Sequence, residues 1–117
     1  RAGLTSRADY LAVLAKSIQT LSGNPGRLRL SLADSSYDAW IRLYRPDENT
    51  RNSSQNYYVN GSIAAMCMDL HVRRHTQGKR SLDDVLRRLF AATYGAGRGL
   101  TEEDVWAAFA SEADAAV

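Results

Sequence analysis

Two adjacent tyrosines stand where a polar segment gives way to an amphipathic one. Tyr57 and Tyr58 follow the segment 45–56, which is rich in Asn and Ser, and precede Asn60 and Gly61. A tyrosine hydroxyl can donate a hydrogen bond to an oxyanion forming on a carbonyl, provided that a shaped, dry pocket holds it. A nearby glycine lets a substrate or another backbone come close. The ordinary alternative is two aromatic residues at a helix start, one buried and one not, and the residue types alone favour that alternative.

Two histidines have a spacing that occurs in zinc sites. His71 and His75 are four residues apart, like the histidines of H-E-x-x-H. The residues between them are Val72, Arg73 and Arg74, so the glutamate is missing and two arginines would repel a dication. No third ligand is obvious. We therefore predict no metal and no cofactor in this chain, with His75 at a solvated helix end where the dipole favours a cation.

Two other sets of residues have ordinary explanations. Adjacent carboxylates such as Asp47 and Glu48 can do acid–base work, but after a proline they are more often turn residues or partners of Arg45 and Arg51. Cys67 lies beside Met66 on an apolar stripe, which predicts a buried, inert thiol. We therefore assign no catalytic step to these residues.

The elements that would position these residues are predicted to be helices. Ser6, Ser81 and Thr101 are each followed three residues later by an aspartate, as at capped helix starts. Helices are expected from Ser6 to about 22, over 32–44, over 57–75, and after Ser81 and Thr101. Apolar stripes would face the core, and they include Tyr37, Trp40, Ile41, Tyr44, Leu86 and Phe90. The segment 45–56 reads as a long loop, and the alternating run 27–32 could form a short strand.

These elements predict an all-α fold of about five helices in an irregular orthogonal bundle, as a single domain over 1–117. A hydrophobic share of 44% is enough for a core, and the net charge is only +2. The arginines are scattered, which argues against a nucleic-acid partner. No apolar run reaches the roughly 20 residues that span a bilayer. We expect a soluble chain and assign it no compartment.

Five segments of the sequence resemble a known family in the same order. They are RAGLTSRADYLAVLAK, SLADSSYDAWIRLYRPDEN, YYVNG, MDLHVRRHTQGKRSLDDVLRRL and GLTEEDVWAAF. Together they resemble the glycyl aminopeptidase family of zinc metallopeptidases, which are thermolysin-like gluzincins. The resemblance implies the C-terminal helical part of a catalytic domain. In that family the H-E-x-x-H helix and the third zinc ligand lie upstream of this region, so zinc would belong to the parent protein.

The resemblance also suggests roles for four residues. The family's Tyr-x-Lys-Gly motif, whose tyrosine stabilises the tetrahedral intermediate, falls on Tyr58 and Gly61, with Asn60 in place of the lysine. Tyr57, Asn60 and Gly61 are expected near the substrate. The implied partners are a peptide substrate and the upstream, zinc-bearing half of the domain, without which the chain would be inactive. The alternative is a helical module that binds peptide or protein without catalysis.

Overall fold

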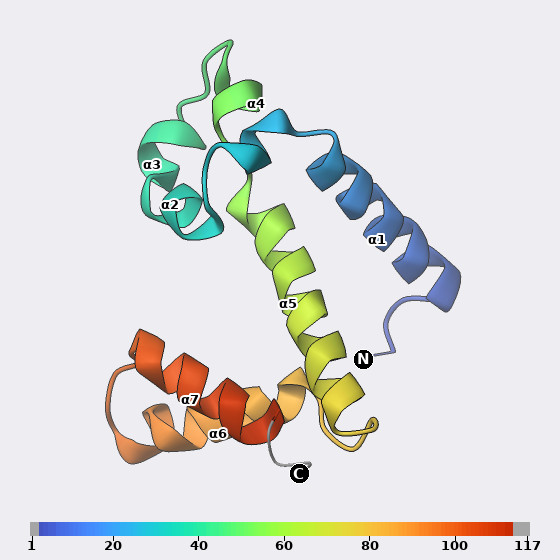
Figure 1. Ribbon diagram of the computed structural model, residues 1–117, viewed down its shortest axis with the longest axis vertical. Helices are drawn as coiled ribbons and strands as arrows, with labels where there is room; N and C mark the ends of the chain where they lie inside the picture. The colour runs from blue at the N-terminus through green and yellow to red at the C-terminus, as the bar shows by residue number, and fades with distance from the viewer. Residues whose placement is uncertain (1–2, 114–117) are drawn as a thin grey trace. The chain divides into compact units, whose positions relative to one another are not determined.

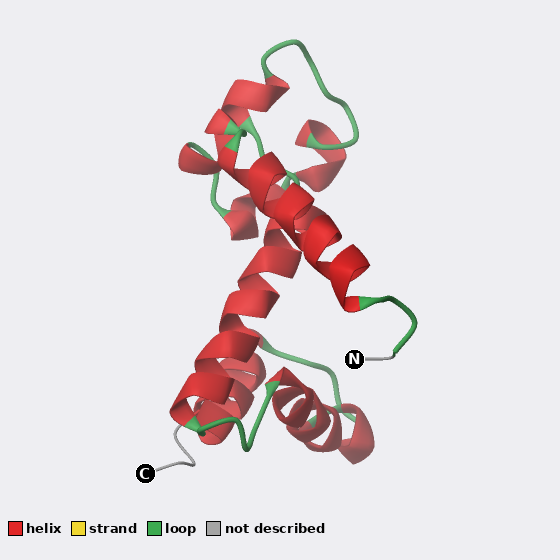
Figure 2. Ribbon diagram, turned by 90° about the vertical axis from the view of Figure 1, so that its right-hand side faces the viewer, coloured by secondary structure: helices red, strands yellow, loops and turns green. Residues whose placement is uncertain are grey.

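The structure is a computed structural model that describes residues 3–113, and over these residues it is helical without a strand (Figure 2). This confirms the predicted all-α class and approximate number of helices. The α-helices are α1 (Arg7–Ser22), α2 (Leu32–Tyr37), α3 (Ala39–Arg42), α4 (Thr50–Ser53), α5 (Tyr57–His75), α6 (Leu82–Ala92) and α7 (Glu102–Ala113) (Figure 1). Two 3₁₀ turns, η1 (Pro25–Leu28) and η2 (Tyr94–Ala96), complete the described elements.

The predicted helix starts are confirmed by their caps. At α1, the Ser6 hydroxyl accepts a hydrogen bond from the backbone N–H of Asp9 at 3.1 Å. At α6, Ser81 and Asp84 form a reciprocal capping box, and α7 begins directly after Thr101. Each cap satisfies backbone N–H groups that the first helical turn leaves without partners. Because this interaction spans only three residues, the sequence is enough to locate it.

The single helix predicted over 32–44 is wrong. The structure has two short helices there, because Asp38 leaves the helical conformation at φ −86° and ψ 11° and divides α2 from α3. The aromatic stripe of this segment is also outside the core. Tyr37 is 90% exposed and Trp40 is 78% exposed. No other element within residues 3–64 covers these rings, so the helical spacing did not reveal what would lie against them.

The short strand considered for 27–32 is not present either. Pro25 begins the 3₁₀ turn η1, and the side chain of Asn24 accepts a hydrogen bond from Gly26 N at 3.0 Å. Proline suits the first helical position, because its missing N–H has no partner to lose there. The predicted loop 45–56 contains one further turn of helix, α4.

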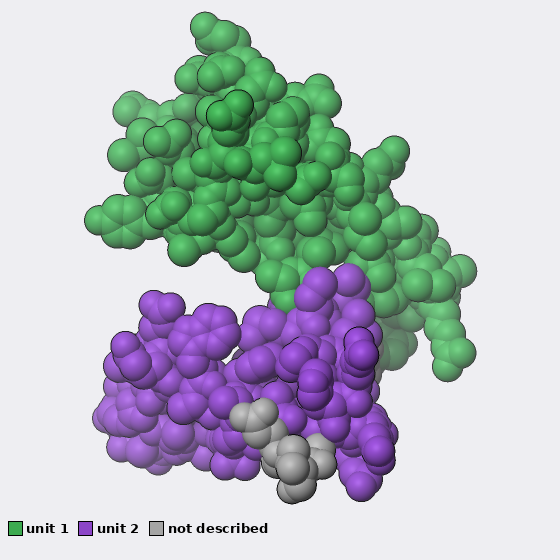
Figure 3. Space-filling model, viewed as in Figure 1, with its two compact units in different colours: residues 1–64 green, residues 65–117 purple. Residues whose placement is uncertain are grey.

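The chain divides into two compact units, residues 1–64 and residues 65–117 (Figure 3). The boundary falls inside α5, and the single-domain assignment stays a prediction. The interior of the first unit is mainly polar. Its buried residues include Ser54, Gln55 and Asn60. A Cβ atom on Gly26 would lie 1.9 Å from the carbonyl oxygen of Ser54, so glycine is needed where η1 meets the end of α4.

The second unit contains the apolar core. Val72, Val85, Ala108 and Ala113 are buried together, with Phe109 among the residues packed against them. The predictions that Leu86 and Phe90 face this core are wrong, because they are 53% and 59% exposed. No helix within residues 3–113 is long and apolar enough to cross a membrane.

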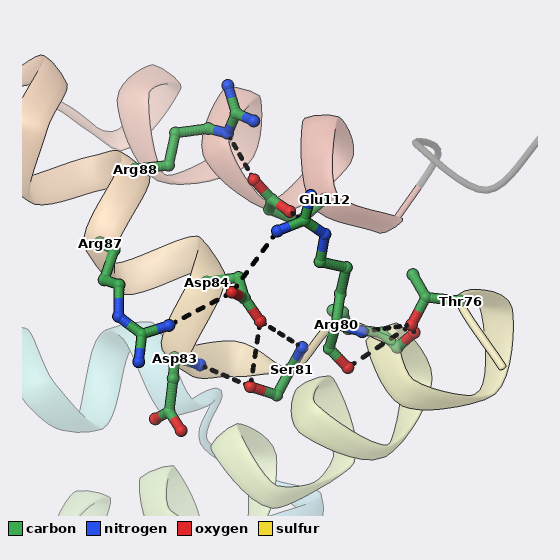
Figure 4. A network of polar contacts seen from close by, with 9 residues as sticks. Thr76, Arg80, Ser81, Asp83, Asp84, Arg87, Arg88 and Glu112 are labelled. Carbon is green, nitrogen blue, oxygen red and sulfur yellow. Dashed lines mark hydrogen bonds and ion pairs between the residues drawn. The ribbon is translucent and has the colours of Figure 1, made fainter. Parts of the chain in front are cut away.

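A buried carboxylate links α6 and α7 in the same unit. Glu112 is 3% exposed, and its Oε1 accepts a hydrogen bond from Nε of Arg88 at 2.7 Å. The Nε of Arg80 lies 3.6 Å from its Oε2. Figure 4 shows these side chains converging on Glu112, with Asp84 pairing Arg87 at 3.2 Å beside them. Burial of a charge is tolerated only with such partners.

Candidate functional site

The first turn of α5 carries the tyrosine pair. Asn56 precedes the helix, and its side-chain oxygen accepts hydrogen bonds from Tyr58 N at 2.9 Å and from Val59 N at 3.4 Å. This cap fixes the backbone from which both phenols project. Tyr58 is 60% exposed, whereas Tyr57 is half-buried. The predicted tyrosine therefore lies at an accessible helix start.

Three phenol hydroxyls meet at this helix start. The Tyr44 hydroxyl lies 2.9 Å from that of Tyr58 and 3.5 Å from that of Tyr57. The rings of Tyr57 and Tyr58 stack with centroids 4.2 Å apart, and Trp40 lies 5.1 Å from the ring of Tyr44. Tyr44 was not among the site residues predicted from the sequence. Its only signal was its place at the end of the aromatic stripe, which gave no indication of contact with α5.

The hydrogen bonds among these phenols shift two pKa values in opposite directions. The hydrogen bond with Tyr44, followed by that with Tyr58, raises the pKa of Tyr57 well above its usual value. The bond with Tyr44, followed by that with Tyr57, lowers the pKa of Tyr58. A phenolate that accepts hydrogen bonds is stabilised, and a phenol that donates one holds its proton more tightly. Tyr58 is thus the more acidic member of the pair.

Asn60 and Gly61 occupy different surroundings from the phenols. Asn60 is 7% exposed, and its side-chain amide donates to Oε1 of Gln55. The amide of Gln55 in turn donates to the backbone carbonyl of Leu30. Asn60 therefore ties the start of α5 to the interior of the first unit. Apart from its chain neighbours and the nearby backbone of α5, no atom lies within 4 Å of the place that a Cβ on Gly61 would take, so this position leaves open space beside the helix.

Among the described residues, the histidine pair is not part of a larger group of possible metal ligands. The rings of His71 and His75 lie 4.1 Å apart, and Nδ1 of His75 is 3.0 Å from the backbone oxygen of His71. Within residues 3–113, no three His, Cys, Asp or Glu side chains are grouped so that they could hold a metal ion.

The two remaining candidates differ in outcome. The carboxylate of Asp47 accepts hydrogen bonds from Asn49 N at 3.0 Å and from the Thr50 hydroxyl at 2.9 Å, which places it in the turn before α4. The prediction of a buried thiol at Cys67 is wrong, because Cys67 is exposed. The fully buried residue of α5 is Val72, so a different face of the helix meets the core.

A comparison with known families bears directly on this site. The family model of the M61 glycyl aminopeptidases matches residues 1–64. The chain belongs to this family. The M61 match spans the whole first compact unit and includes all three phenols and Gly61. No curated protein and no solved structure matches the chain. Membership in M61 relates the chain to an aminopeptidase.

Proposed function

We propose that this chain forms one wall of the peptide-binding cleft of a zinc aminopeptidase, and that Tyr58 stabilises the oxyanion of the tetrahedral intermediate. The observation that carries the proposal is the Tyr58 phenol itself. It is accessible on a capped helix start, its hydroxyl is hydrogen-bonded to Tyr44, and it lies within the part of the chain that matches an aminopeptidase family.

The chemistry asked of Tyr58 is a single hydrogen bond to the substrate. As a nucleophile adds to the scissile carbonyl, negative charge develops on the carbonyl oxygen, and a donor already in place stabilises that charge without reorganisation. The Asn56 cap and the bond to Tyr44 hold the Tyr58 hydroxyl before substrate arrives. Because the bond is strongest when charge is fully developed, it lowers the barrier more than it tightens substrate binding.

The residues around Tyr58 would shape the cleft wall. The open space beside Gly61 would let a peptide backbone approach the helix. The ring of Tyr57 supports that of Tyr58 by stacking. Asn60 would act indirectly, because its amide is engaged with Gln55 and holds the helix start in place.

The proposal requires a second part of the enzyme. The family resemblance implies a zinc ion and a glutamate base, and the described residues contain no group that fits the zinc. We propose that both are held by an upstream half of the catalytic domain, against which this chain packs. That half is the proposed partner, and this chain by itself would not hydrolyse peptides.

The test is hydrolysis of a peptide with an N-terminal glycine by the longer protein that contains this chain. Tyr58→Phe should lower kcat about 10²–10³-fold with little change in KM, as for the loss of one oxyanion donor. Tyr57→Phe is the matched control and should keep near-normal turnover. Normal kcat in Tyr58→Phe would refute the role, and the melting temperature of each variant shows whether it is folded.

One observation favours a second candidate, a helical module that binds peptide or protein without catalysis. The short helices α2 and α3 expose Tyr37, Trp40 and Ile41, and Ile41 is 72% exposed. Aromatic side chains of this kind are common in binding surfaces. A longer protein that binds peptides but releases no N-terminal residue from any of them would decide for this candidate.

A further inference from the structure

The hydroxyl groups of the three tyrosines are linked by hydrogen bonds in a defined order. Tyr44 is the middle member, because its hydroxyl is close to both of the others, at 2.9 Å from Tyr58 and 3.5 Å from Tyr57. The first distance is that of a good O–H···O hydrogen bond, and the second is at the long limit. Tyr44 approaches from the segment that follows α3, whereas Tyr57 and Tyr58 belong to α5.

The number of protons on the three hydroxyl groups determines the direction of their hydrogen bonds. Each phenol has one O–H to donate, although its oxygen can also accept. If Tyr58 donates its proton to the substrate oxygen, it can only accept from Tyr44. Tyr44 has then used its own proton, so it can only accept from Tyr57. The order of donation is therefore Tyr57 to Tyr44, Tyr44 to Tyr58, and Tyr58 to the carbonyl oxygen.

We propose that Tyr44 is a positioning residue, which donates to the Tyr58 hydroxyl and so orients and polarises it toward the substrate oxygen. This inference rests on the proposed oxyanion role of Tyr58. Hydrogen bonds in a chain polarise one another, so a donor behind Tyr58 makes Tyr58 itself a better donor. The ring of Trp40, 5.1 Å from that of Tyr44, supports Tyr44 in turn.

The electrostatics of the cluster agree with this direction. The pKa of Tyr58 is lowered first by its hydrogen bond with Tyr44, and the pKa of Tyr57 is raised first by its own bond with Tyr44. Tyr44 and Tyr57 are the titratable groups that act on Tyr58 among the described residues. A phenol with a lowered pKa is more acidic, and it is therefore a stronger hydrogen-bond donor to a forming oxyanion.

The first arm of the test is kinetic and uses the longer peptidase. Tyr44→Phe should lower kcat about three- to tenfold, the effect of one hydrogen bond, with KM nearly unchanged. Tyr57→Phe should lower kcat less than about twofold, because its bond is longer and one step further away. Tyr94→Phe makes the same change at a 76% exposed ring on η2 and should have no effect. A kcat within twofold of wild type for Tyr44→Phe would overturn the inference.

The second arm does not depend on activity. In the 117-residue chain with ¹³Cζ-labelled tyrosine, NMR can follow the ionisation of each phenol. Tyr44→Phe should move the titration of Tyr58 to higher pH, and Tyr94→Phe should leave it in place. An unmoved Tyr58 titration would overturn the positioning role whatever the kinetics show. If the titration moves while Tyr58→Phe retains full activity, the contact with Tyr44 stands, and it is the proposed function that fails.

Discussion

Tyr58 is both accessible and held in place by a hydrogen bond. Its ring is 60% exposed, so a substrate can reach it, and its hydroxyl is hydrogen-bonded to Tyr44 at 2.9 Å, so its direction is set. An exposed tyrosine without such a bond would lose rotamer freedom each time it met a substrate. Preorganisation by Tyr44 would remove part of that cost before binding, as the proposed role of Tyr58 as an oxyanion donor requires.

Replacement of Gly61 should affect the stability of the chain and substrate binding in different ways. Because its would-be Cβ meets nothing within 4 Å beyond its chain neighbours and the nearby backbone of α5, Gly61→Ala should stabilise the chain by about 0.5–1 kcal/mol. In the longer peptidase the same methyl group would face the substrate, so KM should rise. Urea unfolding of the chain and steady-state kinetics of the peptidase measure the two effects.

The matched comparison for Gly61 is Gly26 in the same unit. A Cβ there would meet the Ser54 carbonyl oxygen at 1.9 Å, so Gly26→Ala should destabilise the chain by about 1–3 kcal/mol, as overpacking does. Destabilisation by Gly61→Ala would contradict the open space that the structure shows. If Gly61→Ala stabilises the peptidase and leaves KM unchanged, Gly61 does not line the substrate-binding wall.

At the scale of the helices, local interactions were predictable and non-local ones were not. The starts of α1 and α6 follow from Ser–Asp pairs three residues apart, and the cap contacts involve no residue outside that span. The contact of Tyr44 with Tyr58 spans 14 residues and depends on where α3 ends and α5 begins. The bond from Asn60 to Gln55 likewise depends on the path of the loop. The sequence could therefore place Tyr58 on a helix start but not name its neighbours.

The start of α7 provides a pH-dependent contribution to stability. Arg98 holds the Asp104 carboxylate with two hydrogen bonds, of 2.7 and 2.6 Å, and Thr101 N donates a third at 2.9 Å. The Arg98 bonds, followed by the Thr101 bond, lower the pKa of Asp104 below the usual carboxyl value of 3.8. A lowered folded-state pKa contributes stability that is complete above about pH 4 and is lost as pH falls through the folded pKa.

Asp104→Asn should therefore lower the melting temperature at pH 7, and the difference from wild type should shrink steadily below about pH 4. Thermal unfolding of both chains between pH 7 and pH 2 measures this. Arg98→Gln should also lower the melting temperature at pH 7, because it removes the guanidinium group that donates two hydrogen bonds to the Asp104 carboxylate. A difference that stays constant across the whole range would mean that the carboxylate charge contributes nothing.

The packing of α6 against α7 depends on a buried carboxylate with an exposed partner. Arg88→Ala should destabilise the chain by about 1–3 kcal/mol, because it leaves the buried Glu112 without its 2.7 Å hydrogen bond. The neighbouring Arg87 makes a matched control. Its side chain is 74% exposed and pairs with Asp84, so Arg87→Ala should change stability by less than about 0.5 kcal/mol. If urea unfolding shows equal losses of unfolding free energy for Arg88→Ala and Arg87→Ala, the burial of Glu112 does not strengthen its interaction with Arg88.

At the scale of the whole chain, the two units differ in what holds them together. Residues 1–64 enclose mainly polar groups such as Ser54 and Asn60, and residues 65–117 enclose the apolar cluster around Val72. The family match coincides with the first unit. Composition could not reveal this division, because its boundary lies within the continuous helix α5 and has no linker to mark it. The helical spacing that predicted Phe90 as core failed for a related reason: it cannot report which face finds a partner.

The helix α1 allows a test of whether the first unit is completed by another part of the protein. None of its residues is buried, and Leu11 and Val13 are 60% and 64% exposed. A 16-residue helix without tertiary support is marginal in water, so in the chain alone its amides should exchange with solvent about tenfold or more faster than those of α6, which buries Val85. In the longer peptidase, the proposed upstream half would cover the apolar side chains of α1 and slow this exchange.

Hydrogen exchange followed by mass spectrometry compares both helices in both proteins, with α6 as the internal control. Equal protection of α1 and α6 in the chain would contradict the exposure of α1, and unchanged exchange of α1 in the longer protein would show that the upstream half packs elsewhere.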